Sequence, residues 1–329
     1  MATIAFLHPV SDYCGSMLGK EGVRGVQNTT IILAECLAAR GHYVEGITGF
    51  QGVEEHNGVI WSAKPGKEHY DLAVANLYPR YLDLVSAKRK CVWVHNPMNR
   101  WSRFKKSIRG LIKHRPEAVF VTDYQIHTTP AIFPFSKRHV IEHGIEEFFL
   151  NAERKGTAPE PVAIFTSQGG RNLDSVINMW KQVIHPKLEA AQLHLYCSLP
   201  DNLISKDLAE FNIIHKGLVP QKQLIQAYSD SRVMFYPGHS EETFCNVAHE
   251  AVICGLPVVT MGIGGIRDRI QNGKNGIIVK TRQEMAEAAL KILQDDQEWL
   301  RLHEAAITET QYHTWKNRAE LWEKIFLES

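Results

Sequence analysis

Residues 233–266 read VMFYPGHSEETFCNVAHEAVICGLPVVTMGIGGI, and this stretch decides the fold that we expect. An apolar run over residues 233–236 predicts a buried strand. A helix is expected to begin near residues 244–246 and to stop before Gly255, after which residues 257–260 form a second apolar run. A strand, a helix and another strand in this order form the unit from which parallel sheets are built.

Short apolar runs of the same kind recur along the chain, with helical stretches between several of them. In the first half they cover residues 3–7, 43–47, 72–75, 91–94, 118–121 and 139–141. In the second half they cover residues 162–166, 193–197, 213–214, 233–236, 257–260 and 276–279. One helix is expected to be capped by Asn28, Thr29 and Thr30 and to stop at Gly41. The alternation predicts an α/β protein with doubly wound parallel sheets.

The length of the chain, 329 residues, suggests two domains of about 150 residues each. The polar stretch 151–161, which contains Pro and Gly, is the candidate linker. We therefore expect an N-terminal domain over residues 1–155, a C-terminal domain over residues 156–311, and a last helix in residues 312–329 that packs back on the N-terminal domain. Two such domains would face each other across a cleft lined by strand carboxyl ends, where ligands usually bind.

Composition excludes several classes of protein. The formal net charge is +1, so the molecule as a whole is not built to neutralise a polyanion, and no nucleic-acid partner is expected. The 6 cysteines show neither a Cys-x-x-Cys pair nor a metal-ligand spacing, which fits a reducing compartment. Neither a secretion signal nor an apolar run of about 20 residues is present, so a cytoplasmic location is expected.

The predicted helix after residue 243 points free backbone N–H groups and a positive dipole end toward the strand ends, which suits a phosphate. Glu242 lies just outside the helix start, and Glu250 follows eight residues later. Carboxylates of this kind accept hydrogen bonds from sugar hydroxyls, a ribose diol included. The spacing alone does not establish such a ligand site. An acid that caps the helix and a glutamate exposed to solvent would explain Glu242 and Glu250 equally well.

The order of motifs around these acids decides between the two interpretations. Glu242 and Glu250, followed by Gly-Leu-Pro at 255–257 and by Gly-Gly at 264–265, resemble the GT-B fold retaining glycosyltransferases of family 4, also called glycosyl transferases group 1. Further matching segments are Gly-Val-Gln at 25–27, Ala-Arg-Gly-His at 39–42, His-Asn-Pro at 95–97, His-Gly-Ile at 143–145 and residues 166–174. The resemblance covers nearly the whole chain and is clearer in its second half.

The resemblance implies two Rossmann-like domains and a sugar transfer from a nucleotide-sugar to a hydroxyl of a glycan, lipid or small molecule. It implies retention of anomeric configuration, no cofactor and no metal, and the chain contains no Asp-x-Asp pair. Glu250 would bind the ribose, Glu242 would face the transferred sugar, and Arg171 would neutralise the pyrophosphate. The implied catalytic residues are Glu242, His95 and Arg171; the other donor-binding residues are Gly25, Val26, Leu218, Val219, Thr243, Phe244, Cys245, Asn246 and Glu250.

Three departures from the family pattern limit what the resemblance implies. Many relatives have a lysine about five residues after the arginine, whereas this chain has Val176 there. Lys216 is a candidate substitute as the second phosphate-binding cation. Thr243 and Cys245 replace glycines that are common around the phenylalanine of the motif, so the donor sugar is not inferred.

The histidines at strand ends are assigned separately. His95 follows the strand at 91–94. A lone histidine at a strand end is more often structural, but in the context of the resemblance His95 is expected to contact the donor sugar or to carry a proton at the reacting centre. His8 and His143 also lie at predicted strand ends, and we interpret them as packing or hinge residues.

Residues 100–115 contain seven Arg and Lys and no acid. Their apolar residues recur at helical spacing: Trp101, Phe104, Ile108, Leu111 and Ile112. The segment predicts a basic amphipathic helix that could contact an anionic membrane peripherally or hold a phosphorylated lipid acceptor. An ordinary surface helix with solvated charges is the alternative, which Gly110 favours because it weakens the helix.

Two other functions remain open from the sequence. A dinucleotide oxidoreductase is disfavoured, because Gly19, Gly22 and Gly25 do not form Gly-x-Gly-x-x-Gly after the first strand. A GT-B binding protein without turnover is the third hypothesis, and the presence of Glu242, Glu250 and Arg171 together argues against it.

Overall fold

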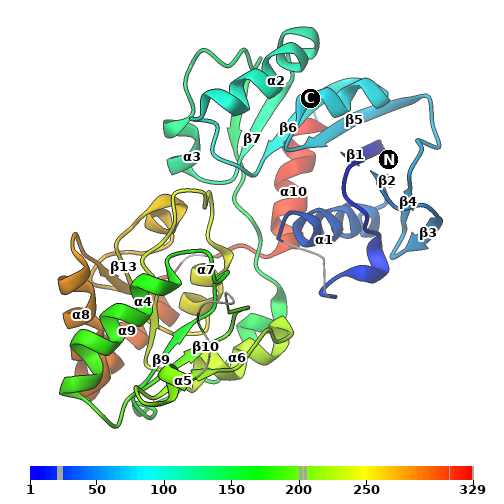
Figure 1. Ribbon diagram of the computed structural model, residues 1–329. Helices are drawn as coiled ribbons and strands as arrows, with labels where there is room; N and C mark the ends of the chain where they lie inside the picture. Colours follow the sequence, from blue (N-terminus) through cyan, green and yellow to red (C-terminus); the bar gives the residue numbers. More distant parts are fainter. Residues whose placement is uncertain (21–24, 200–202, 204–205, 311, 328–329) are drawn as a thin grey trace. The chain divides into compact units, whose positions relative to one another are not determined.

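The computed structural model describes residues 1–20, 25–199, 203, 206–310 and 312–327. The chain divides into unit 1, which comprises Met1–Gly144 and His313–Ser329, and unit 2, which comprises Ile145–Tyr312 (Figure 1). The chain thus passes from unit 1 to unit 2 after Gly144, and residues 152–161, without helix or strand, lie inside unit 2. In the described part of the chain, no helix is long and apolar enough to span a bilayer.

Unit 1 is built on an eight-stranded sheet in the order β3-β4-β2-β1-β5-β6-β7-β8. Neighbouring strands are parallel except β3 and β4, which pair antiparallel. The strands are β1 (Thr3–His8), β2 (Tyr43–Thr48), β3 (Val53–His56), β4 (Val59–Ser62), β5 (His69–Asn76), β6 (Ser86–Val94), β7 (Glu117–Phe120) and β8 (Arg138–Val140). The helices are α1 (Gly25–Ala39), α2 (Trp101–His114), α3 (Asp123–Thr128) and α10 (Trp315–Phe326), with 3-10 turns η1 (Gly15–Met17) and η2 (Pro79–Leu84).

The hairpin of β3 and β4 was not predicted, because β3 does not form an apolar run. Its four residues, Val53–His56, alternate between exposed and half-buried positions at the sheet edge. Asn57 and Gly58 join the strands with φ angles of 48° and 77°. Two left-handed residues, Asn then Gly, are typical of a two-residue hairpin turn. This dipeptide was the sequence signal for the hairpin.

The predicted start of the first helix was wrong. Helix α1 begins at Gly25 and not at the expected cap residues. The hydroxyls of Thr29 and Thr30 donate to the carbonyl oxygen of Val26 at 3.0 and 2.7 Å, so they bond back along the helix instead of capping it. The end of the helix was predicted well: α1 ends at Ala39, and Gly41 is left-handed, with φ of 88°.

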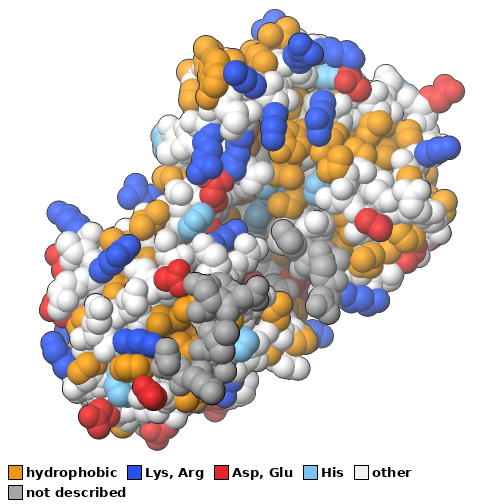
Figure 2. Space-filling model, viewed as in Figure 1, with side chains coloured by type: hydrophobic (Ala, Val, Ile, Leu, Met, Phe, Trp, Pro, Cys, Tyr) orange, Lys and Arg blue, Asp and Glu red, His pale blue; other side chains and the backbone are white. Residues whose placement is uncertain are grey.

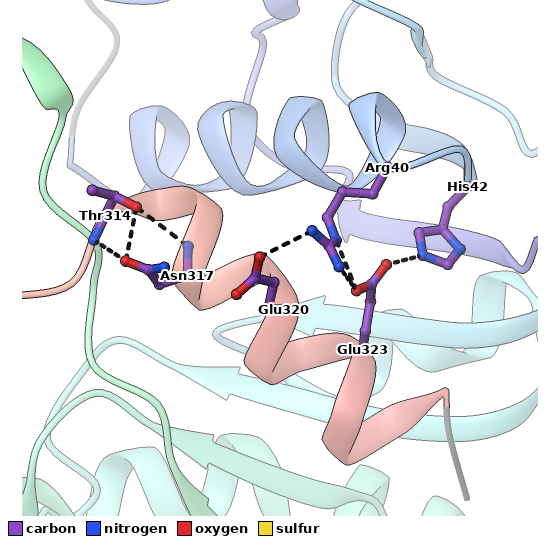
Figure 3. Close-up of polar contacts among 6 residues, drawn as sticks. All are labelled: Arg40, His42, Thr314, Asn317, Glu320 and Glu323. Carbon is purple, nitrogen blue, oxygen red and sulfur yellow. Dashed lines mark hydrogen bonds and ion pairs between the residues drawn. The ribbon is translucent and has the colours of Figure 1, made fainter.

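The C-terminal helix α10 packs beside α1 in unit 1 (Figures 1 and 3). Glu323 accepts hydrogen bonds from Arg40 Nε at 2.7 Å and from His42 Nε2 at 2.6 Å (Figure 3). Arg40 also reaches Glu320 at 3.2 Å. The residues that follow α1 therefore bind α10, whose buried face comprises Trp315, Arg318, Ala319, Trp322 and Phe326.

Unit 2 contains an all-parallel six-stranded sheet in the order β11-β10-β9-β12-β13-β14. Its strands are β9 (Val162–Phe165), β10 (Gln192–Leu195), β11 (Ile213–His215), β12 (Val233–Phe235), β13 (Val258–Thr260) and β14 (Gly276–Ile278). Its helices are α4 (Leu173–Met179), α5 (Lys206–Ala209), α6 (Gln221–Ser229), α7 (Asn246–Ile253), α8 (Arg282–Gln294) and α9 (Asp296–Glu309), with shorter turns η3 (Glu147–Asn151), η4 (Trp180–Ile184), η5 (His185–Lys187) and η6 (Gly264–Asp268). One hydrophobic core joins the strands to α4, α7 and α8.

Candidate functional site

The loop between β12 and α7 is held by the Gly-Gly turn that opens η6. The N–H of Gly265 donates to the carbonyl oxygen of Glu242 at 2.8 Å. A Cβ atom on Gly265 would lie 2.2 Å from the carbonyl oxygen of Thr243, and one on Gly264 would lie 2.2 Å from that of His239. Both glycines therefore let two backbone segments approach closely, and together they fix the position of Glu242.

Glu242 is the centre of a buried polar cluster formed by three elements. Its side chain is only 3% exposed and forms an ion pair with Arg171, which lies between β9 and α4. The hydroxyl of Tyr236, at the end of β12, donates to Glu242 Oε2 at 2.7 Å. Both carboxylate oxygens thus have partners, as a buried charge requires. We call Arg171, Tyr236 and Glu242 the carboxylate cluster.

The electrostatics of the carboxylate cluster fix the charge states of Arg171 and Tyr236. Burial disfavours the charge on Arg171, but the attraction and hydrogen bond of Glu242 outweigh it and raise the pKa of Arg171. Burial first, and then the charge of Glu242, raise the pKa of Tyr236 far above its ordinary value. Arg171 is therefore a permanent cation, and Tyr236 stays a protonated donor.

Helix α7 begins directly after this loop, where Cys245 is its N-cap residue. Cys245 is left-handed, with φ of 69°, and its side chain is buried. This conformation costs a residue with a Cβ about 1–2 kcal/mol, so the position would suit a glycine, as the resemblance in the sequence implies. Thr243 and Phe244 are buried just before it, and Asn246 is the first residue of the helix. The amino end of α7, with its positive dipole end, thus lies beside the carboxylate cluster.

Glu250 lies on the same helix but has other partners. Gln221 Nε2 donates to Glu250 Oε1 at 3.0 Å, and the hydroxyl of Tyr228 lies 3.3 Å from Oε2. Both partners belong to α6. Burial raises the pKa of Glu250 to about 8, with a smaller contribution from Glu146. Glu250 is therefore mainly protonated at neutral pH, and it is held by α6 and not by Arg171.

The residues expected beside the base lie between β11 and α6. Leu218 is 72% exposed, while Val219 is half-buried against the core. Val219 and Lys216 line a cavity of about 790 Å³ in unit 2 together with His194 and Tyr196. Val176, where the resemblance implies a lysine, is fully buried and belongs to the core. A lysine at position 176 would therefore need a different packing of α4.

His95 lies in unit 1 at the carboxyl end of β6. Its ring lies 4.5 Å from that of Trp93 and 5.6 Å from that of His143, and Nε2 is 3.3 Å from Asn76 Oδ1. Burial, followed by the charges of His143 and His8, lowers the pKa of His95 well below its usual value. The neutral imidazole suits a hydrogen-bonding role and opposes a role as a resident cation.

The other strand-end residues of unit 1 are placed as follows. His8 packs on Tyr13 and Tyr81, and His143 packs on Trp93 and Trp315, so packing is the role that the structure shows for both. Gly25 and Val26 form the first turn of α1. Gly22, which was considered with Gly19 and Gly25 for a dinucleotide-binding motif, lies outside the described residues.

Four residues that sequence reasoning did not assign take part in these contacts. Tyr236 binds Glu242, Gln221 and Tyr228 bind Glu250, and Asn172 Nδ2 donates to the carbonyl oxygen of Gly238 at 2.6 Å. The position of Tyr236 at a strand carboxyl end was a usable signal. The other three required knowledge of which helices and loops pack together. In the ranges that the structure describes, no group of three or more His, Cys, Asp or Glu residues could hold a metal ion.

Comparison with known proteins supports the resemblance seen in the sequence. Residues 160–295, which include the carboxylate cluster, match the family described as glycosyl transferases group 1. A D-inositol 3-phosphate glycosyltransferase of Corynebacterium aurimucosum is 30% identical over 112 residues, which are 33% of this chain and 26% of that protein. One of Frankia alni is 35% identical over 86 residues, 25% of this chain and 21% of that protein. The matched part thus spans about a quarter of these relatives.

Solved structures match over the whole chain. Sucrose-phosphate synthase from Thermosynechococcus elongatus has a TM-score of 0.77 at 17% identity, with 100% of both chains covered. HepE of Anabaena, in complex with UDP and glucose, has a TM-score of 0.72 at 14% identity, again over 100% of both chains. WaaG, a glycosyltransferase involved in lipopolysaccharide biosynthesis, has a TM-score of 0.68 at 14% identity, over 99% of this chain and 100% of that one. The GT-B fold predicted from the sequence is confirmed.

Proposed function

We propose that this chain is a glycosyltransferase that moves a sugar from a nucleotide-sugar to a hydroxyl of a glycan, lipid or small-molecule acceptor. The carboxylate cluster at the start of α7 is the observation that carries the proposal. It combines a permanent cation, a buried carboxylate and a helix amino end within the segment that matches the glycosyl transferases group 1. A pyrophosphate and a sugar require groups of these kinds.

Arg171 and the amino end of α7 would stabilise the pyrophosphate leaving group. The Arg171 side chain is 29% exposed, whereas Glu242 is 3% exposed, so Arg171 is the more accessible member of the ion pair. A guanidinium has five N–H donors, and Arg171 can therefore keep Glu242 and also bind a phosphate. Fixed positive groups placed where negative charge develops lower the barrier to transfer. We propose that this arrangement stabilises the negative charge of the leaving group without a metal ion.

Glu242 would face the transferred sugar and accept hydrogen bonds from its hydroxyls. Arg171 binds Glu242 Oε1 and Tyr236 binds Oε2, and a carboxylate has about four acceptor sites, so a sugar hydroxyl would share an oxygen with Arg171 or Tyr236. Glu250 would bind the ribose. Gln221, which now donates to Glu250, would then give up or share that contact.

The stereochemical proposal follows from the family resemblance. The acceptor oxygen would form its bond on the face of the sugar carbon from which the phosphate leaves. The departing phosphate oxygen would take the acceptor proton, so no protein base is required. Retention is tested by the anomeric coupling constant of the product in proton NMR; an inverted product would contradict it.

The absence of a metal ion from the proposed mechanism is tested with excess chelator. Unchanged turnover would support the metal-free mechanism, and a loss of turnover that Mg²⁺ restores would contradict it.

The donor is tested by isothermal titration of the whole chain with UDP, GDP, ADP, TDP and NAD. HepE, described above, was solved with UDP and glucose, so UDP-glucose is the first nucleotide-sugar to try. Donor hydrolysis and transfer are followed by mass spectrometry, with inositol phosphate among the acceptors because the relatives carry D-inositol 3-phosphate in their names. Preference for NAD over every nucleoside diphosphate would favour an oxidoreductase. Tight nucleotide binding without turnover would favour a binding protein.

A further inference from the structure

Helix α2 presents an unusual surface within unit 1. The segment 100–115, predicted to be a basic amphipathic helix, does form a helix over Trp101–His114. It carries seven Arg and Lys and no acid. Lys105, Lys106 and Arg109 are exposed, and no acid of the described chain lies within ion-pair distance of them. The side chain of Lys113 is also exposed, at 64%, although it pairs with Asp83.

One side of α2 is buried in unit 1, and the other side lies at the surface. Ser107, Gly110 and Leu111 are buried. A Cβ atom on Gly110 would lie 2.9 Å from the Arg80 backbone nitrogen, so this glycine lets α2 pack closely on η2. Gly110 thus has a packing role and is not a sign of an unstable helix. The ordinary surface-helix alternative predicts that the remaining apolar residues are also covered.

Two large apolar side chains of α2 are not covered. Trp101 is 66% exposed and Ile112 is 64% exposed. At 100° per residue, 11 positions apart is close to three full turns, so both side chains lie on one side of the helix. Lys105 lies next to Trp101, with Nζ 5.8 Å from the Trp101 ring centre. The exposed apolar stripe therefore borders the exposed cations.

The loop after α3 adds a third apolar side chain to this region of unit 1. Ile132 is 68% exposed. Its neighbour Phe133 is buried against Phe104 of α2, with ring centres 5.2 Å apart, and Phe104 stacks on Trp101 at 5.0 Å. Figure 2 shows hydrophobic and Lys or Arg side chains side by side over the part of unit 1 where α2 lies in Figure 1. We call Trp101, Ile112, Ile132 and the α2 cations the α2 surface.

We propose that the α2 surface binds peripherally to a lipid bilayer that contains anionic headgroups. The cations match the charge of such a bilayer, and the three exposed apolar side chains match its acyl boundary. A soluble polyanion would satisfy the charges but would leave Trp101, Ile112 and Ile132 in water. The bilayer is therefore the partner that uses every feature of the surface. The inference is independent of the reaction proposed above.

The test uses the whole chain and sucrose-loaded vesicles, which are sedimented to separate bound from free protein. One set contains phosphatidylcholine alone, and the other contains phosphatidylcholine and phosphatidylglycerol in equal amounts. Wild type is expected to sediment with the mixed vesicles, more weakly at high salt, and to stay free with phosphatidylcholine alone. Lys105→Gln/Lys106→Gln/Arg109→Gln should reduce partitioning by roughly a hundredfold, because each cation near such a surface contributes roughly fivefold.

Two further variants separate charge from apolar contact. Trp101→Ser/Ile112→Ser keeps all cations and should still lose at least about tenfold in partitioning. Lys187→Gln/Lys280→Gln/Arg282→Gln removes the same charge from three exposed positions of unit 2 and should sediment like wild type. All substituted side chains are exposed or partly exposed, and circular dichroism with a thermal melt verifies that each variant is folded.

Three results would overturn the proposal. Wild type that stays free of mixed vesicles has no such surface. An equal loss of vesicle binding in the α2 charge variant and the unit 2 charge variant would show that binding depends on net charge alone. Binding to heparin that is unaffected by Trp101→Ser/Ile112→Ser, together with no vesicle binding, would assign the surface to a soluble polyanion.

Discussion

At the scale of single residues, the site depends on how buried charges are balanced. Glu242 is acceptable in the core because Arg171 and Tyr236 bind both of its oxygens. Glu250, with two uncharged partners, avoids the same cost by remaining protonated near neutral pH. The two acids, one on the loop and one on the helix, thus have different partners, an ion pair for Glu242 and uncharged donors for Glu250, which sequence spacing alone could not indicate.

Replacing Tyr236 by Phe tests whether this hydroxyl positions Glu242. Loss of one hydrogen bond to a buried carboxylate should lower stability by about 1–3 kcal/mol. It should also lower kcat about tenfold or more with little change in KM, because the donor would still bind Arg171 and α7. Steady-state kinetics and a thermal melt measure both effects. Tyr312→Phe, which removes the hydroxyl of a 45% exposed side chain elsewhere in unit 2, is the control and should change neither value.

The raised pKa of Glu250 predicts a pH-dependent stability. Its folded-state pKa, about 8, lies above the ordinary value of 4.5. The unfolded chain therefore ionises first, and the contribution of Glu250 to stability, fully present below the ordinary value, is lost as pH rises through about 8. Glu250→Gln should remove this loss, so the variant should be more stable than wild type at about pH 9, on the order of a few kcal/mol, and similar to it at about pH 4. Urea unfolding at both pH values measures the difference, and a parallel shift at both would contradict the assignment.

At the scale of elements, the strands were predictable where they contain a short run rich in apolar residues. The strands of unit 2 are short apolar runs, and each was found with ends within about two residues. β5 and β6 begin earlier than expected, at His69 and Ser86, because their first halves carry polar and charged residues. The Glu242 loop was located by its motif, but its partners Arg171 and Tyr236 come from two other elements. That contact is set by tertiary packing and not by local sequence.

The Gly-Gly turn offers a test at this scale. Gly265→Ala would place a Cβ atom 2.2 Å from the Thr243 carbonyl oxygen, and the loop that carries Glu242 would have to move. We expect a loss of stability of about 1–3 kcal/mol. The loss of turnover should be larger than the decrease in the folded fraction of the protein can explain. Thermal melts and kinetics are compared with Gly156→Ala, whose Cβ meets no atom within 4 Å. Normal turnover in Gly265→Ala would show that the loop position is not critical.

At the scale of the whole molecule, the two sheets and the return of the chain to unit 1 define the architecture. The return depends on α10, whose Glu323 binds the residues that follow α1 (Figure 3). The GT-B fold was predictable because strand runs and motif order are both visible in the sequence. The pairing of Arg40 and His42 with Glu323 was not, because it joins residues about 280 positions apart.

Glu323→Ala tests how much this contact holds α10 on unit 1. The Glu323 side chain is 12% exposed and binds two cationic or polar groups, so its removal should lower the midpoint of thermal unfolding by several degrees. Glu320→Ala is the matched control, because that side chain is 55% exposed and should contribute little. Limited proteolysis of the C-terminal segment gives a second reading. Equal melting of both variants would contradict the assignment.

The central claim is that Glu242 acts in sugar transfer, and one comparison tests it most directly. Donor hydrolysis or transfer is measured for wild type, Glu242→Gln and Glu241→Gln under the same conditions, with the donor identified by titration. The account predicts that Glu242→Gln loses about a hundredfold or more in kcat/KM while Glu241→Gln stays near wild type. Unchanged turnover in Glu242→Gln, or an equal loss in both variants, would contradict it.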